Sequence, residues 1–276
     1  MQLSMKQKGV CHYAAVGGYR CMGDFLIVSK VERIQEYKQI ANEYHLGFEL
    51  NDFYVPSVLE DPFRQQELTC QYHHVGLPAG STMHGAFLDV VLFSEDPQIR
   101  RVSRLRMSQS MDIAQKVGVK GVVFHTNSNP VLSGDYYDRR VVDMVSEYIA
   151  QLLETYPGID IYLENMFETH PVLLAAIAKE LESYPGFGIC LDYAHAAISG
   201  TAMDVWVDSL AGFVRHLHIN DNDLKRDLHL AVGDGDIDWK QFASYYRQYF
   251  SSCSTLIETE LPEQQIRSLQ YLKQLL

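Results

Sequence analysis

Eight short segments rich in β-branched and aromatic residues recur along the chain from Asp24 onward, and a longer segment with helical spacing of apolar residues follows each one. This alternation is typical of a parallel sheet built from βαβ units. Eight such units in 276 residues match a closed barrel, which typically takes about 250 residues. We therefore predict an α/β fold with (β/α)8 TIM-barrel architecture and strands at residues 25–29, 47–51, 81–87, 121–125, 159–164, 187–192, 214–219 and 255–258.

Residues that favour helix ends lie between the predicted strands. Asp96, which is followed by a proline, predicts the start of a helix, and Gly118 predicts its end. Asp238 and Gln241 have the spacing of a capping box and predict a helix over residues 239–250. These signals agree with the eightfold repeat.

The chain contains no long Gly/Ser-rich or Pro-rich linker, so we expect one domain over residues 1–276. Residues 1–23 do not follow the repeat. A strand-like run at residues 10–14 precedes a Gly17-Gly18 turn, and we expect a small N-terminal hairpin or cap there.

Acidic residues outnumber basic ones. There are 35 Asp and Glu against 23 Lys and Arg, which gives a formal net charge of −12. This charge repels polyanions at long range and makes nucleic acid a less expected partner.

The remaining composition bears on location. Five widely spaced cysteines without a Cys-x-x-Cys pair favour reduced thiols. The N-terminus lacks the apolar core of a signal peptide, and no apolar run approaches the roughly 20 residues of a membrane span. We expect a cytoplasmic protein without a membrane partner, and a homo-oligomer is compatible with the sequence.

Five predicted strands end in imidazole or carboxylate side chains. A barrel gathers the C-terminal ends of its strands around one pocket, and these side chains are the ligands of divalent metal sites. The sequence therefore predicts a metalloenzyme whose first candidate ligands are His125, Glu164, Asp192 with His195, His218, and Glu258.

Glu164 and Glu258 follow apolar residues on strands that should be buried on both faces. A carboxylate there is costly unless it is paired or bound to a metal. Two inward glutamates suit acid/base work on a sugar carbon held between them. A salt bridge to a neighbouring strand is the alternative for Glu258.

Two histidine placements are open to more than one interpretation. Asp192 and His195 could both reach an ion, or Asp192 could cap the next helix while His195 is an interior histidine. Strand alternation puts His216 and His218 on one face. His218 lies nearer the strand end and is expected at the pocket, with His216 deeper as a core or supporting residue.

Further candidates lie at other strand ends and loops. His84 and His125 end the third and fourth strands, although a lone histidine there is more often structural. Asp227 and His229 occupy alternate loop positions that could aim both at one ion. Phe87 could line the pocket mouth or cover the barrel top. The residues predicted to bind substrate are Phe87, Asn127, Asn165 and His195.

From Asp24 onward the chain resembles the xylose isomerase-like (β/α)8 superfamily, which contains sugar isomerases and epimerases and the endonuclease IV branch. Leu-Glu164-Asn, Leu-Asp192-Tyr-Ala-His195, His218-Ile-Asn-Asp, Asp227-Leu-His229 and Gly233-Asp-Gly-Asp-Ile-Asp-Trp carry the resemblance. The ketose 3-epimerase branch implies one divalent metal held by Glu164, Asp192, His218 and Glu258, with both glutamates exchanging protons with substrate. That branch usually has an arginine where this chain has the Asp227 and His229 pair.

The endonuclease IV branch implies three zinc ions instead. The matching residues are His84, His125, Glu164, Asp192, His195, His218, Asp227, His229 and Glu258. The whole ligand set is present, which disfavours a catalytically inactive binding barrel.

We therefore predict a sugar or sugar-phosphate isomerase or epimerase that depends on one divalent ion (Mn, Mg, Co or Zn) and transfers a proton through a metal-stabilised enediolate. Glu164 and Glu258 would be its catalytic residues, and its partner would be a small sugar or sugar phosphate. The alternative is an endonuclease IV-like phosphodiesterase with two or three zinc ions, for which few phosphate-binding cations are found near the strand ends.

Overall fold

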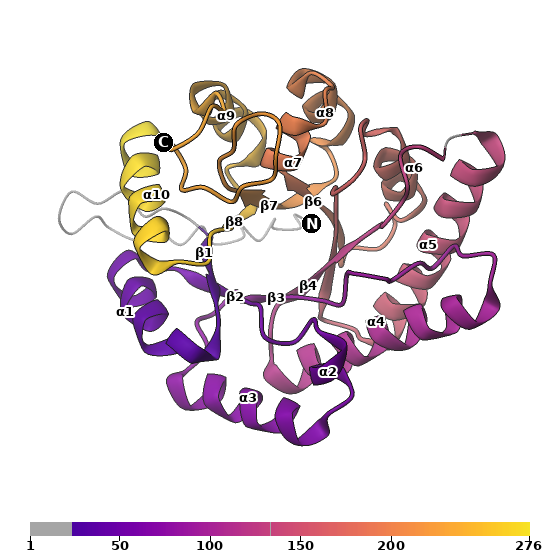
Figure 1. The fold of residues 1–276 in the computed structure, drawn as a ribbon, viewed down its shortest axis with the longest axis horizontal. Coiled ribbons are helices and arrows are strands. Elements are labelled where there is room, and N and C mark those ends of the chain that lie inside the picture. Colours follow the sequence, from indigo (N-terminus) through magenta and orange to yellow (C-terminus); the bar gives the residue numbers. More distant parts are fainter. Residues whose placement is uncertain (1–23, 133) are drawn as a thin grey trace, which may run out of the picture.

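Eight parallel strands close into a barrel in the order β1 to β8, and helices surround it (Figure 1). The computed structural model describes residues 24–132 and 134–276. β1 pairs with both β2 and β8, which closes the ring. The predicted (β/α)8 barrel is confirmed, with strands β1 Phe25–Ser29, β2 Gly47–Leu50, β3 Thr82–His84, β4 Gly121–His125, β5 Asp160–Glu164, β6 Phe187–Asp192, β7 Val214–Ile219 and β8 Ser254–Ile257.

The helices follow the strands in chain order, with some loops carrying an extra helix. They are α1 Ile34–Tyr44, α2 Pro56–Leu59, α3 Pro62–Val75, α4 Pro97–Val117, α5 Asp135–Thr155, α6 Val172–Glu180, α7 Tyr193–Ile198, α8 Met203–Leu210, α9 Trp239–Tyr245 and α10 Pro262–Leu275. A 3-10 turn, Val31–Arg33, precedes α1. The predicted hairpin or cap over residues 1–23 lies outside the described residues.

The predicted helix signals are confirmed at α4. The Asp96 carboxylate accepts a hydrogen bond from the backbone N–H of Gln98, and Gly118 ends the helix in the left-handed conformation. At α9 the Asp238 carboxylate accepts from Lys240 and Gln241 as an N-cap should.

Two boundaries differ from prediction by several residues, and the predicted limits of β2, β5 and β8 are each wrong by one residue. β3 ends at His84 and not at residue 87, because the backbone N–H of Ala86 donates to Ser110 Oγ on α4 instead of to a neighbouring strand. The Gln241 side chain donates to the Tyr245 hydroxyl, so it does not complete the capping box. The predicted helix 239–250 is α-helical only to Tyr245 and continues as a π-helical turn, Tyr246–Phe250.

The strands are buried on both faces, as expected for a parallel barrel covered by helices. Every residue of β1, β4 and β6 is buried. Leu26, Val28 and Leu256 form one buried apolar cluster of the barrel. At the C-terminal ends the interior becomes polar, since Glu164, Asp192 and His218 are all buried there.

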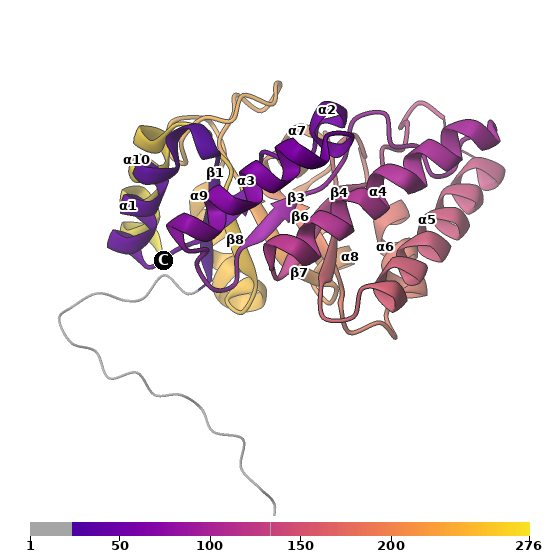
Figure 2. The same ribbon diagram turned by 90° about the horizontal axis from the view of Figure 1, so that it is seen from below.

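The loops at the C-terminal ends of the strands are long. Figure 2 shows the segment between β7 and α9, in orange, rising above the strands on the side that also carries α2. Within residues 24–132 and 134–276, no helix combines the length and apolar character needed to cross a membrane.

Candidate metal centre

The nine predicted metal ligands lie together in three adjoining groups. We call them centre A (His84, His125, Glu164), centre B (Glu164, Asp192, His218, Glu258) and centre C (His195, Asp227, His229). Within each centre, one ligand atom from every residue lies within 4.8 Å of the others. Glu164 belongs to both A and B, so the two centres are neighbours.

Centre A joins the ends of β3, β4 and β5. His84 Nε2 lies 3.1 Å from His125 Nε2, and His125 Nε2 lies 3.0 Å from Glu164 Oε2. The other nitrogen of His84, Nδ1, lies 2.9 Å from the carbonyl oxygen of Gly85 and is placed to donate to it. Burial, together with the neighbouring His125, lowers the pKa of His84. A neutral His84 can then turn an Nε2 lone pair toward the centre.

Centre B holds three carboxylates around one imidazole. His218 Nδ1 lies 3.2 Å from Glu164 Oε2 and 3.5 Å from Glu258 Oε1. Within the described chain, both oxygens of Glu164, Oδ2 of Asp192 and Nδ1 of His218 are buried without a hydrogen-bond partner. Buried polar atoms are nearly always satisfied, so this orphaned donor set fits a divalent cation.

The electrostatics of centre B point the same way. Burial raises the pKa of Asp192 well above its usual value, and the carboxylates of Glu258 and Glu164 raise it further while His195 opposes them. Burial also raises the pKa of Glu164, but His218 and His125 outweigh it and hold that pKa well below normal. Carboxylates this close together repel one another unless a cation lies among them.

In centre C, one carboxylate oxygen of Asp227 lies close to both histidines. His195 Nε2 and His229 Nε2 lie 3.3 Å and 3.0 Å from Asp227 Oδ2. His195 Nδ1 lies 2.9 Å from the carbonyl oxygen of Asn165, and His229 Nδ1 lies 2.9 Å from that of Glu258. Donation from Nδ1 to a backbone carbonyl leaves Nε2 as the metal-facing nitrogen.

The charged state of centre C follows from its partners. Burial would lower the pKa of His229, but Glu258 and Asp227 raise it to about 10. The two histidines in turn hold the pKa of Asp227 below its usual range, against the effect of burial. Both shifts favour a protonated imidazole at His229 when no metal is bound.

The loop that carries centre C is held by a buried aspartate. Asp221 forms an isolated bridge with Leu230, in which each backbone N–H donates to the other's carbonyl at 2.9 Å. Asp221 Oδ2 accepts from Gly233 N at 2.9 Å and from Trp239 Nε1 at 2.7 Å. A Cβ on Gly235 would lie only 2.4 Å from the carbonyl oxygen of Asn222, which explains a glycine in this turn.

Asp192 combines the two roles that the sequence left open. Its Oδ1 accepts from the backbone N–H of His195 at 2.6 Å and caps α7. Its Oδ2 remains free of hydrogen bonds within the described chain and faces centre B.

The residues predicted to bind substrate lie around the centres. Phe87 is half-buried beside centre A, with ring centroids 5.0 Å from His84, 5.2 Å from His125 and 5.3 Å from Tyr54. It forms an aromatic wall with Tyr54. His195 is part of centre C.

The two predicted asparagines are occupied by backbone contacts. Asn127 Nδ2 donates to the carbonyl oxygens of Phe87 and Val90. Asn165 Nδ2 donates to the carbonyl oxygen of Asp192, and its Oδ1 accepts from Asp192 N. In this geometry both asparagines hold the loops and strand ends that shape the site.

Sequence reasoning missed Glu49 on β2, which is fully buried beneath centre B. Its Oε2 accepts from Thr82 Oγ1 at 2.7 Å and lies 3.2 Å from His216 Nε2. The signal was available, because a carboxylate on a strand buried on both faces is the feature that singled out Glu164. His216 lies deeper than His218, as predicted.

The chain is similar in sequence and in fold to several known proteins. The chain is 28% identical over 167 residues to a probable endonuclease 4 of Mycobacterium leprae, covering 56% of this chain and 64% of that relative's length. The fold resembles the TTHB071 protein from Thermus thermophilus soaked with ZnCl2 (TM-score 0.72, 23% identity, 91% and 97% of the two chains). It also resembles a D-tagatose 3-epimerase-like protein (TM-score 0.73, 22% identity, 91% and 96% of the two chains). Residues 29–275 match the model of the xylose isomerase-like TIM barrel family, and the chain belongs to that family.

Proposed function

We propose that this protein is a metal-dependent phosphoester hydrolase that uses centres A, B and C together. The observation that carries the proposal is the adjoining arrangement of the three centres, two of which share Glu164. A one-ion isomerase needs centre B alone. It would leave His84, His125, Asp227 and His229 without a role, although each of them belongs to a group of side chains that could hold a metal ion.

The ligands would be the residues of the three centres, with zinc favoured at A and C because those centres are rich in imidazole. Divalent ions at adjacent centres, when bound, supply positive charge for the displacement at phosphorus and lower the pKa of water. Glu164 would be a ligand in both centre A and centre B, since its Oε2 lies 3.0 Å from His125 Nε2 and 3.2 Å from His218 Nδ1.

The protein's own residues would prepare the site in three ways. The backbone carbonyls of Gly85, Asn165 and Glu258 orient the histidines that they face. Asn165 holds the Asp192 backbone, which aims that carboxylate. The wall of Tyr54 and Phe87 borders centre A and would exclude water from one side of the substrate.

We expect the substrate to be a small phosphoester and not a long polyanion. The net charge of −12 disfavours nucleic acid. Two of the cations near the strand ends are also engaged in ion pairs. Arg226 pairs with Asp223 at 2.7 Å, and Lys30 pairs with Glu260 at 2.6 Å.

A sugar isomerase or epimerase is the second candidate. It is favoured by Glu164 and Glu258, which both approach His218 Nδ1 from within centre B, and by the similarity in fold to a D-tagatose 3-epimerase-like protein. In that case the two glutamates would move a proton on a carbon next to the sugar carbonyl.

Metal content and activity distinguish the candidates. Protein purified without chelator is expected to hold two or three zinc ions per chain by elemental analysis and to cleave bis(p-nitrophenyl) phosphate, with the activity lost on chelation and restored by zinc. One exchangeable manganese, magnesium or cobalt ion per chain, with turnover of ketoses or their phosphates, would establish the isomerase instead. Faster cleavage of abasic-site DNA than of the small ester would reject the small-substrate assignment.

A further inference from the structure

Glu49 is a carboxylate in the barrel interior whose ion-pair contacts, in the part of the chain that the structure describes, are with histidines alone. Its Oε2 is hydrogen-bonded to Thr82 and His216. Its Oε1 lies 3.2 Å from His218 Nε2, and within the described chain neither of these two buried atoms has a hydrogen-bond partner. Burying a carboxylate costs free energy. The position of Glu49 beneath His218, a candidate metal ligand, therefore indicates that Glu49 has a function there.

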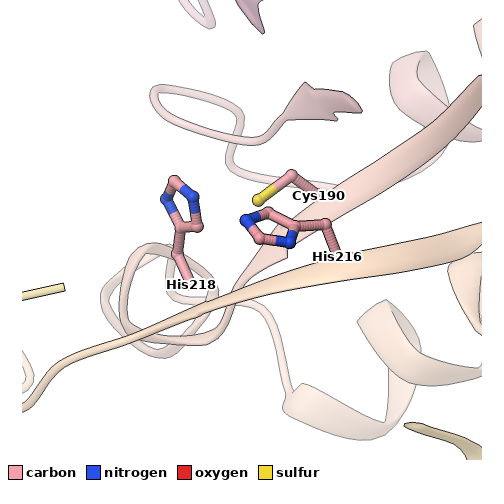
Figure 3. Close-up of side chains that lie close together, drawn as sticks. All are labelled: Cys190, His216 and His218. Atoms are coloured by element: carbon pink, nitrogen blue, oxygen red, sulfur yellow. The ribbon is translucent and has the colours of Figure 1, made fainter. Parts of the chain in front are cut away.

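The side chains next to Glu49 do not form a metal centre of their own. Cys190, His216 and His218 lie close together (Figure 3). Both nitrogens of His216 are already engaged, Nδ1 at 2.6 Å from Ser254 Oγ and Nε2 at 3.2 Å from Glu49 Oε2. The His216 ring also stacks on Tyr162, with centroids 5.0 Å apart and planes at 18°. His216 is therefore a fixed support that holds one side of Glu49.

The two ring nitrogens of His218 face different carboxylates. Nδ1 faces Glu164 and Glu258 of centre B, and Nε2 faces Glu49. A neutral imidazole carries one proton, and the nitrogen without it can offer a lone pair to a metal. A carboxylate beside Nε2 favours the proton there and leaves Nδ1 for centre B.

We propose that Glu49 is a positioning residue that keeps the His218 ring proton on Nε2 and thereby raises the metal affinity of centre B. Centre C does not share this dependence, because its histidines are oriented by the backbone carbonyls of Asn165 and Glu258. The inference rests on the proposed metal-dependent function.

The variant Glu49→Gln tests it with little change in volume. A glutamine amide is uncharged and has one accepting oxygen, so it cannot present an acceptor to both His216 and His218 as a carboxylate can. Zinc affinity and stoichiometry would be measured by competition with a chromophoric chelator, in the wild type and in the Asp227→Ala background, which removes a ligand of centre C. We expect one ion per chain to bind about 10- to 100-fold more weakly in both backgrounds.

The matched control is Glu168→Gln. Glu168 is also buried, and it accepts from Thr126, Ser128 and the backbone of Met166, outside the three centres. We expect this variant to keep the wild-type zinc affinity. In zinc-loaded wild type, nitrogen-15 NMR should place the ring proton of His218 on Nε2 and show it protected from exchange, and Glu49→Gln should lose that protection.

The outcomes separate the inference from the proposed function. Equal zinc affinity and an equally protected His218 proton in wild type and Glu49→Gln would overturn the inference alone. A wild-type protein that binds no ion would overturn the proposed function as well. If Glu49→Gln does not fold, Glu49→Asp keeps the charge but shortens the reach, and wild-type affinity in that variant would also reject the positioning role.

Discussion

Centres B and C use similar side chains, but the structure places them by different means. Three ligands of centre B follow from strand backbones, since Glu164, Asp192 and His218 are the last or nearly last residues of β5, β6 and β7, and all are buried. In centre C, Asp227 and His229 come from the long loop after β7, and their side chains are 34% and 37% exposed.

This difference predicts that the two centres differ in rigidity and in their dependence on metal and pH. The closed barrel sets the geometry of centre B and places buried carboxylates close together, where a cation would offset their repulsion. Centre C depends on the folding of a loop around Asp221 and can relieve its charge by protonating histidines. Centre B should therefore be rigid and strongly dependent on metal, whereas centre C should be more adaptable and more sensitive to pH.

The largest effect is expected from Glu164→Gln, because this residue serves centres A and B. We expect the loss of two ions per chain and a decrease in kcat/KM of about 10³-fold. Elemental analysis and steady-state kinetics would measure both, with Glu168→Gln as the control. Full ion content in Glu164→Gln would contradict the shared-ligand assignment.

A smaller loss is expected from Asp227→Ala, which removes the carboxylate of centre C. If the three centres act together, one ion should be lost and kcat/KM should fall about 10²-fold. Centre B should keep its ion, because its ligands come from the strand ends. Activity within about twofold of wild type would instead favour the one-ion isomerase, for which this loop carries no chemistry.

The smallest effect concerns the pH dependence of stability in the metal-free protein. The pKa of His229 is raised to about 10 in the folded state, against about 6.5 when unfolded. Its contribution to stability is therefore fully present below about pH 6.5 and is lost as the pH rises toward 10. Thermal unfolding should show wild type most stable relative to His229→Gln near pH 6, with the difference shrinking toward pH 10. A difference that grows with pH would contradict the charged state assigned to centre C.

The sequence predicted the barrel well because each strand carries its own local signal. The bounds of β1, β4, β6 and β7 agree with the prediction. β3 was overextended, because the sequence after His84 continues with small and apolar residues while the backbone has already turned to bond Ser110 on α4. That hydrogen bond joins distant parts of the chain and leaves no local pattern.

The sequence predicted some residues of the candidate site better than others. Glu164 was identified by its buried strand, but the same argument applied to Glu49 and was not used. His84 and His125 were ambiguous one at a time, since a lone histidine is more often structural. The pairing of β3 with β4 brings their Nε2 atoms to 3.1 Å, and this distance makes the pair a ligand candidate. The roles of Asn127 and Asn165 as loop supports also depend on backbone partners that are far away in sequence.

By itself the sequence determined the repeat of eight strands and helices and provided the nine candidate ligand side chains, because periodicity and residue chemistry are local properties. The tertiary structure decided which candidate ligands lie together, which nitrogen of each histidine faces the other members of its group, and that Glu49 lies beneath His218. These features depend on strand register and barrel closure, which bring together residues far apart in the sequence, such as Glu49 and His216, which are 167 positions apart.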